Sequence, residues 1–126
     1  MAIKQRSGVV TLLRVHDLGT GYGPSTDFLN VEVIVWLDSK PGFAYGFQLR
    51  RDDYLPAREG MFQLLLAAFR NQWPVVMDTD EESGHKNHHI IRVWVDRSSI
   101  NTTPETPTEA LPIKSVGSSR RIKSRR

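Results

Sequence analysis

The chain has 126 residues, no cysteine and a formal net charge of +3 at pH 7. Its length suits one domain, and the lack of cysteine excludes disulfides and thiolate metal sites. Residues 1–100 hold 11 Lys/Arg against 12 Asp/Glu, whereas residues 101–126 hold 6 against 2. The positive charge therefore belongs to the C-terminal segment, and the rest of the chain has no excess of cations to attract a nucleic-acid backbone.

The N-terminal half predicts three strands, from runs of alternating or continuous apolar residues. In the second strand the odd positions from Leu29 to Leu37 are all aliphatic, so we expect that side to face the core. The segment Ser39–Gly42 predicts a turn, which favours a hairpin between the second and third strands. The three predicted strands are Val9–His16, Phe28–Leu37 and Phe43–Arg50.

A helix is predicted next, with Pro56 at its first position and a body from Ala57 to Asn71. Its apolar residues cover about 200° of a helical wheel, whereas one core needs roughly 100°. The excess favours a second contact, such as another subunit. Two more strands follow, Trp73–Asp78 and His89–Asp96. In the last strand we expect Ile91, Val93 and Val95 to face one way and Ile90, Arg92 and Trp94 the other.

The predicted order is therefore β-β-β-α-β-β, a mainly β fold with one helix. In a chain of this length it favours a closed five-stranded Greek-key barrel over residues 1–97. This order resembles the OB fold, and the long helix before the fourth strand is similar to that of pentameric bacterial toxin B subunits. The resemblance covers residues 8–96 and implies a ring-forming oligomer with a glycan ligand. Residues 98–126 are predicted to be a flexible Thr/Pro/Ser-rich basic tail.

The motifs of common enzymes and metal sites are missing. The loop Gly19–Pro24 is followed by a strand rather than a helix, which argues against a phosphate-binding loop. No Gly-x-Ser-x-Gly elbow occurs, and the histidines at 85, 88 and 89 match no zinc pattern. His88 and His89 are adjacent in a predicted strand, so they should point to opposite faces. We therefore expect no catalytic residue, no metal and no cofactor.

The outer side of the barrel carries the strongest functional signal. If the aliphatic odd residues point inward, Phe28, Ile34, Trp36, Ile90 and Trp94 point outward, with Glu32 and Arg92 among them. Such a surface can stack bases or sugars, form a subunit interface, or be covered within the monomer. The Gly19–Pro24 loop often borders the ligand groove of OB folds, which adds Tyr22. Candidate ligand-binding residues are Tyr22, Trp36, Arg92 and Trp94; candidate interface residues are Phe28, Ile34, Met61, Leu64 and Ala68.

These features favour a non-enzymatic, homo-oligomeric binding or scaffolding module, cytoplasmic and without a membrane partner, because no apolar segment could span a bilayer or act as a signal peptide. One alternative is a single-stranded nucleic-acid-binding protein that combines barrel aromatics with a cationic tether. A further alternative is a glycan-binding subunit, implied by the toxin resemblance. The tether would consist of Arg120, Arg121, Lys123, Arg125 and Arg126.

Overall fold

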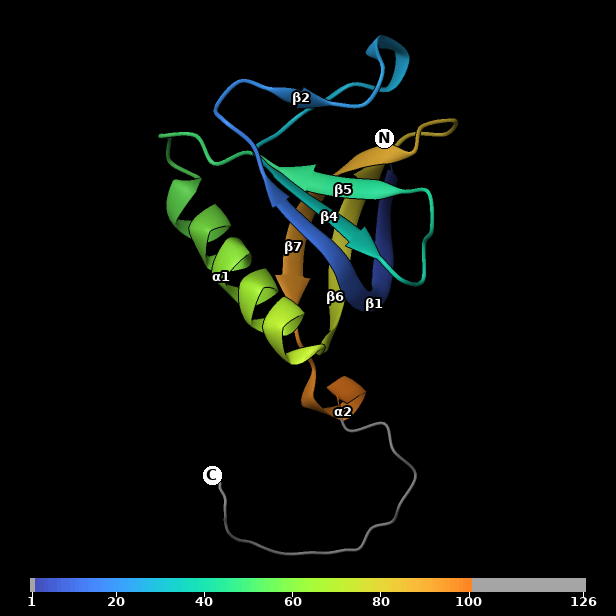
Figure 1. Ribbon diagram of the computed structural model, residues 1–126, viewed down its shortest axis with the longest axis vertical. Helices are drawn as coiled ribbons and strands as arrows, with labels where there is room; N and C mark the ends of the chain where they lie inside the picture. Colours follow the sequence, from blue (N-terminus) through green and yellow to red (C-terminus); the bar gives the residue numbers. More distant parts are fainter. Residues whose placement is uncertain (1, 101–126) are drawn as a thin grey trace, which may run out of the picture.

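In the computed structural model, which describes residues 2–100, five strands close into a barrel in the order β1-β4-β5-β7-β6 (Figure 1). Neighbouring strands are antiparallel except for β5 and β7, which are parallel. One long helix, α1, connects β5 to β6. This confirms the predicted fold class, a mainly β, OB-like β-β-β-α-β-β barrel. The strands are β1 (Ala2–Val15), β4 (Val33–Leu37), β5 (Ala44–Phe47), β6 (Pro74–Glu81) and β7 (Asn87–Trp94).

Strand β1 closes the barrel because it pairs with two neighbours. Its first half, from Ala2 to Val9, pairs with β6, and its second half, from Val10 to Val15, pairs with β4. The strand is therefore longer than the predicted Val9–His16. Residues 2–8 are mostly polar and lack apolar alternation, so no strand was predicted there. The structure nevertheless pairs their backbone with β6.

The predicted strand Phe28–Leu37 is broken at Val31 and Glu32. Its second part is β4, whose Val33, Val35 and Leu37 face the barrel core as predicted. Its first part belongs to a small ribbon made of β2 (Gly21–Tyr22), the 3₁₀ turn η1 (Ser25–Asp27) and β3 (Leu29–Asn30). Figure 1 shows this ribbon lying across one end of the barrel, above β5.

The ribbon covers part of the barrel's outer surface. Leu29 and Val31 from the ribbon side pack with Ile34 and Ala44 in a buried cluster separate from the barrel interior. Leu12 and Tyr22 pack against its margin. Ile34 thus points out of the barrel as predicted but is fully buried. Three interpretations of the outer surface were given above: a ligand face, a subunit interface, or a surface covered within the monomer. At Ile34 the third is correct.

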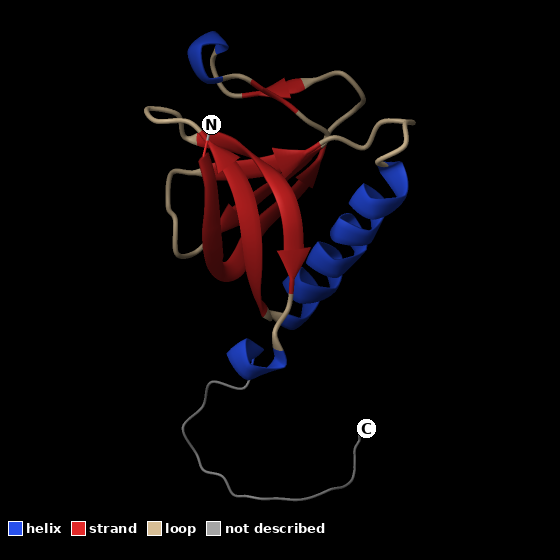
Figure 2. Cartoon of the chain, turned by 180° about the vertical axis from the view of Figure 1, so that it is seen from behind, coloured by secondary structure: helices blue, strands red, loops and turns tan. Residues whose placement is uncertain are grey.

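Helix α1 (Leu55–Asn71) lies along the outside of the barrel, as both views show (Figures 1 and 2). Leu65 and Ala68 are fully buried in the barrel core. The helix ends at Asn71, and the next residue, Gln72, caps it with a left-handed φ of 58°. Phe69 is 40% exposed. The core therefore contacts only a narrow stripe of the predicted apolar arc. Met61 and Phe62 also belong to this stripe, since both pack against the core while partly buried.

Strand β7 contains a bulge that corrects one prediction. Asp78 pairs with Arg92, but the next residue, Thr79, pairs with Ile90, so Ile91 is an extra residue. A bulge shifts the alternation of side chains by one position. Ile90 is therefore buried in the core and Ile91 is exposed, which is the reverse of the expected facing. Beyond the bulge, Val93 and Val95 pack against the core as predicted.

Candidate ligand groove

A groove of about 470 Å³ lies where the ribbon meets the barrel. The ribbon supplies one wall, β4 and the start of β5 supply the floor, and the turn between β6 and β7 supplies the other wall. In OB folds this outer face of the second and third barrel strands, flanked by the same two loops, is the usual ligand surface. The lining residues are Tyr22, Gly23, Pro24, Asp27, Trp36, Gly42, Phe43, Ala44, Lys86 and Asn87.

Asp27 fixes the ribbon to the turn between β6 and β7. Its carboxylate accepts hydrogen bonds from the backbone N–H of Lys86 at 2.8 Å and of Asn87 at 3.4 Å, and it lies 3.0 Å from Nδ1 of His85. In return, Asn87 Nδ2 donates to the backbone oxygen of Asp27 at 2.8 Å. Burial alone would raise the pKa of Asp27, but these donors outweigh it and hold the pKa below its ordinary value. The anchor is therefore strongest with the carboxylate ionised.

Glu32 fixes the other end of the ribbon loop. It is a buried carboxylate that accepts hydrogen bonds from the backbone N–H of Gly19 at 3.1 Å and of Leu49 at 2.8 Å. Arg50 donates to both of its oxygens, at 3.0 and 2.9 Å. Burial would raise the pKa of Glu32, but Arg50 and the two N–H groups outweigh it and lower the pKa. The expectation that Glu32 lies on an open outer surface was wrong, because the loop folds over it.

Aromatic rings line the groove, and cations lie beside two of them. Trp36 is 38% exposed on β4. Lys40 Nζ lies 4.7 Å from the centre of the Phe43 ring, and the Arg14 guanidinium lies 5.7 Å from the centre of the Tyr22 ring. Lys86 adds a third cation on the far wall. The one lining carboxylate, Asp27, is already engaged by the hydrogen bonds described above. The groove is thus locally cationic although residues 1–100 carry a net charge of −1.

Two of the four predicted ligand-binding residues, Tyr22 and Trp36, lie in this groove. The other two lie on β7, away from it. Arg92 pairs with Asp78 at 3.0 Å and lines a second hollow, beneath α1. Trp94 is half-buried opposite Val76 on β6. The prediction placed all four on one surface, but the pairing of β7 with β5 and β6 separates them.

The predicted interface residues are scattered in the same way. Phe28 is 57% exposed, and its ring covers Gly21 across the ribbon. Ile34 and Ala68 are fully buried within the chain, so their assignment to an interface was wrong. Met61 packs partly against the core, and Leu64 is half-buried on α1. Self-association stays a prediction, and Phe28, Met61 and Leu64 are the residues of this set that keep exposed surface.

The remaining predicted sites divide between described and undescribed residues. The tether Arg120, Arg121, Lys123, Arg125 and Arg126 lies outside the described residues. His88 is buried and its neighbour His89 is exposed, so the two do face opposite ways as predicted. Within residues 2–100, no three His, Asp or Glu side chains come together in a way that could hold a metal ion.

Sequence reasoning missed several groove residues. Lys86 and Asn87 were not among the predicted site residues, but the parallel pairing of β5 with β7 places Asn87 beside Ala44. A barrel of this topology requires that pairing, so the predicted fold contained a usable signal. Phe43 was predicted only as the first residue of the third strand; it packs against the core and also lines the groove. Arg14 and Lys40 had no signal in the sequence, since their place depends on how the loops fold.

Comparison with known proteins gave no significant match to a family model, a curated protein or a solved structure. In the part of the chain that the structure covers, no helix combines the length and apolarity needed to cross a membrane.

Proposed function

We propose that the chain is a non-enzymatic binding module that holds single-stranded nucleic acid in the ribbon groove. The observation that supports this best is the convergence of three aromatic rings, Tyr22, Trp36 and Phe43, with three cations around one groove. Exposed rings stack on bases of any sequence, and cations along the margin attract the phosphates. The groove also occupies the usual ligand face of an OB barrel.

The basic C-terminal segment would add to this binding. Five of the last seven residues are Lys or Arg, which gives salt-sensitive affinity for any polyanion. The groove and the tail differ in what they recognise, because the tail has no aromatic ring with which to stack on bases. A chain ending at residue 114 should therefore bind more weakly but still require the groove aromatics.

The test is fluorescence anisotropy of a labelled single-stranded oligonucleotide of mixed sequence, titrated with the full chain. We expect Trp36→Ala to weaken binding about tenfold, because loss of one stacking contact costs about 1–3 kcal/mol. Trp94→Ala is the matched control, since it removes the same side chain outside the groove, and it should bind as the wild type does. No binding by the wild type at low salt, or equal loss in both variants, would contradict the proposal.

Salt dependence separates the two contributions. Neutralisation of phosphates by the three groove cations predicts a slope of about 2 for the logarithm of Kd against the logarithm of salt concentration in the chain ending at residue 114. The full chain should show a steeper slope. Equal slopes for the two chains would show that the C-terminal segment does not contact the nucleic acid and that the groove alone binds it.

The finer resemblance to pentameric toxin B subunits suggests a different ligand for the same rings. An exposed tryptophan such as Trp36 can also stack on a sugar. A glycan array therefore gives a direct alternative. Binding to glycans, together with no binding to oligonucleotides, would replace the nucleic-acid proposal with a glycan-binding one.

We also propose that the chain self-associates through the exposed edge of α1 that carries Phe69. The observation that favours this is Phe69 itself, a large apolar residue that is 40% exposed on the helix. Exposed apolar surface of this kind often marks a contact. Sedimentation equilibrium at tens of micromolar should give a mass above that of one chain, and Phe69→Ser should lower it. A monomer mass for the wild type would contradict this proposal and leave groove binding untouched.

A further inference from the structure

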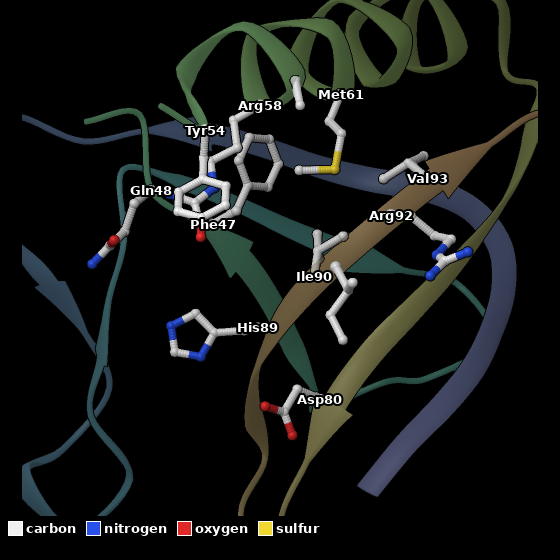
Figure 3. Close-up of a pocket in the computed structure, with 12 residues that line it drawn as sticks. Phe47, Gln48, Tyr54, Arg58, Met61, Asp80, His89, Ile90, Arg92 and Val93 are labelled. Carbon is white, nitrogen blue, oxygen red and sulfur yellow. The ribbon is translucent and has the colours of Figure 1, made fainter. Parts of the chain in front are cut away.

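A second hollow, of about 540 Å³, lies beneath the N-terminal half of α1. Figure 3 shows the side chains of Arg58 and Met61, from α1, and of Tyr54, from the loop before it, pointing into the hollow near Phe47. His89 on β7 and Asp80 on β6 lie further from the helix. Phe47 and Ile90 are core residues of the barrel, so this side is apolar and fixed. None of the residues assigned to the ribbon groove lines this hollow.

The charges around the hollow are nearly all balanced. Its lining residues that can carry a charge near neutral pH are Arg58, Asp80, His89 and Arg92. Arg92 pairs with Asp78 at 3.0 Å. Arg58 lies 4.0 Å from the Asp52 carboxylate, and its guanidinium lies 5.1 Å from the centre of the Tyr54 ring. Each arginine therefore has a carboxylate within ion-pair distance.

Asp80 is the exception. Among the residues that the structure describes, no cation pairs with its carboxylate, and its Oδ1 atom is enclosed without a hydrogen-bond donor. Its partner across the strand pair is His89, whose pKa is lowered, chiefly because partial loss of water around the ring disfavours its charged form. A lowered pKa makes His89 a poorer source of positive charge for Asp80 than an ordinary histidine. A carboxylate with one enclosed, unpaired oxygen gains stability from a cation placed at its accessible oxygen.

We propose that this hollow binds a small organic amine, with its ammonium group at Asp80 and its apolar body against Tyr54, Met61 and Ile91. The ammonium group would supply the missing positive charge and donate a hydrogen bond to the accessible oxygen of Asp80, and an unprotonated nitrogen of His89 can accept a second hydrogen bond from it. Tyr54 is 65% exposed and offers an aromatic ring, and Met61 offers an adaptable thioether, to a ring or alkyl chain of the ligand. An anion would instead meet the unpaired carboxylate.

The test is calorimetric titration of the full chain with phenethylamine, and with 2-phenylethanol as the neutral molecule of the same shape. We expect saturable binding of the amine at least about tenfold tighter than that of the alcohol, because a hydrogen bond to a charged group contributes about that factor. Equal affinity for the two molecules would overturn the assignment of Asp80. Failure of both to bind would overturn the site itself.

Substitutions locate the site. Asp80→Asn removes the charge and should weaken amine binding about tenfold or more. Asp53→Asn removes one charge from an exposed position outside the hollow and should leave amine binding unchanged. If Asp80→Asn fails to fold, amide chemical shifts in the wild type decide: the amine must move the resonances of His89 and Ile90. Loss in both variants, or shifts confined to other residues, would overturn the proposal.

This site and the ribbon groove can fail separately. Trp36→Ala should weaken oligonucleotide binding but not amine binding, whereas Asp80→Asn should weaken amine binding but not oligonucleotide binding. An amine that bound only through the groove would lose affinity in Trp36→Ala and would contradict the second site.

Discussion

The barrel interior and the ribbon are held by different forces. The interior is an apolar cluster that joins all five barrel strands and α1, with residues such as Val35, Leu65 and Met77 fully buried. The ribbon covers only a small apolar cluster and is fixed at its ends by two carboxylates, Asp27 and Glu32. Burial of apolar area stabilises the whole fold, whereas a few hydrogen bonds stabilise one segment.

This difference places the groove at the boundary between a rigid part and a less strongly held part. Trp36 and Phe43 belong to the barrel side, while Tyr22 belongs to the ribbon. Changes in the interior should therefore lower the stability of the whole protein. Changes at the two carboxylate anchors should lower stability less and should also weaken ligand binding.

The largest effect is expected in the interior. Leu65→Ala removes a fully buried side chain where α1 meets the barrel. We expect the free energy of unfolding to fall by about 2–5 kcal/mol, because the substitution loses apolar burial and leaves a cavity. Urea unfolding measures this, and Leu18→Ala, at a residue 68% exposed, is the control. Similar losses in both variants would mean that α1 does not pack as described.

Acid should weaken the barrel through Glu81. The hydrogen bonds from Arg6 lead the causes that lower the pKa of Glu81 from 4.5 to about 2. A carboxyl with a depressed folded-state pKa adds stability above its unfolded pKa and loses it as the pH falls through the folded value. We expect unfolding free energy to drop by about 3 kcal/mol between pH 5 and pH 1 from this group.

Urea unfolding at a series of pH values, with Glu81→Gln beside the wild type, checks this. The variant should start less stable at pH 6 and lose less on acidification. Asp27 and Glu32 also have lowered pKa values, so the variant keeps part of the acid sensitivity. A pH profile parallel to that of the wild type would show that Glu81 does not carry the charge coupling.

A smaller change in stability is expected from Glu32→Gln. The amide keeps one acceptor oxygen, but in either orientation its NH₂ group faces a donor of Arg50 and the backbone N–H of Gly19 or Leu49. We expect a loss of about 2 kcal/mol in the free energy of unfolding, since hydrogen bonds to charged groups contribute about that much. Oligonucleotide affinity should fall as well, measured by anisotropy at a temperature where the variant is folded. Unchanged affinity would show that the position of the ribbon loop does not affect oligonucleotide binding in the groove.

The smallest stability change is expected from Gly23→Ala. Gly23 has a φ of +98°, and a Cβ there would lie 2.6 Å from both Asn87 Nδ2 and the Asp27 backbone oxygen. The methyl group therefore strains the turn and pushes the ribbon from the β6–β7 turn, at a cost of about 1 kcal/mol. Gly84→Ala is the control, because it has a similar φ of +88° but open space at Cβ. Only Gly23→Ala should weaken oligonucleotide binding; equal binding by the two variants would contradict the docked ribbon.

The sequence predicted the barrel well because period-two alternation reports which side of a strand is buried. It predicted the inward Val33, Val35 and Leu37 for that reason. It could not predict that Leu29 and Val31, which continue the same alternation, cover an outer face. Aliphatic side chains can be buried either inside the barrel or beneath the ribbon outside it. Only the break in the strand at Glu32 separates the residues of the two clusters.

Only two of the four predicted ligand-binding residues lie in the groove, because the prediction relied on the alternation of side chains along each strand. Tyr22 and Trp36 were found from their residue type and expected position, and both line the groove. Arg92 and Trp94 were placed with them because alternation was extended through β7, but a bulge and a parallel pairing direct that strand elsewhere. Bulges leave no clear mark in an apolar run such as Ile90-Ile91.

The three tryptophans give the most direct measurement of the central claim. Each indole N–H gives one resonance in the amide proton–nitrogen spectrum of the full chain. Addition of a single-stranded oligonucleotide should move the Trp36 resonance, because its ring faces the groove, and leave those of Trp73 and Trp94 in place. If the oligonucleotide binds and Trp36 does not respond, the groove is not the nucleic-acid site.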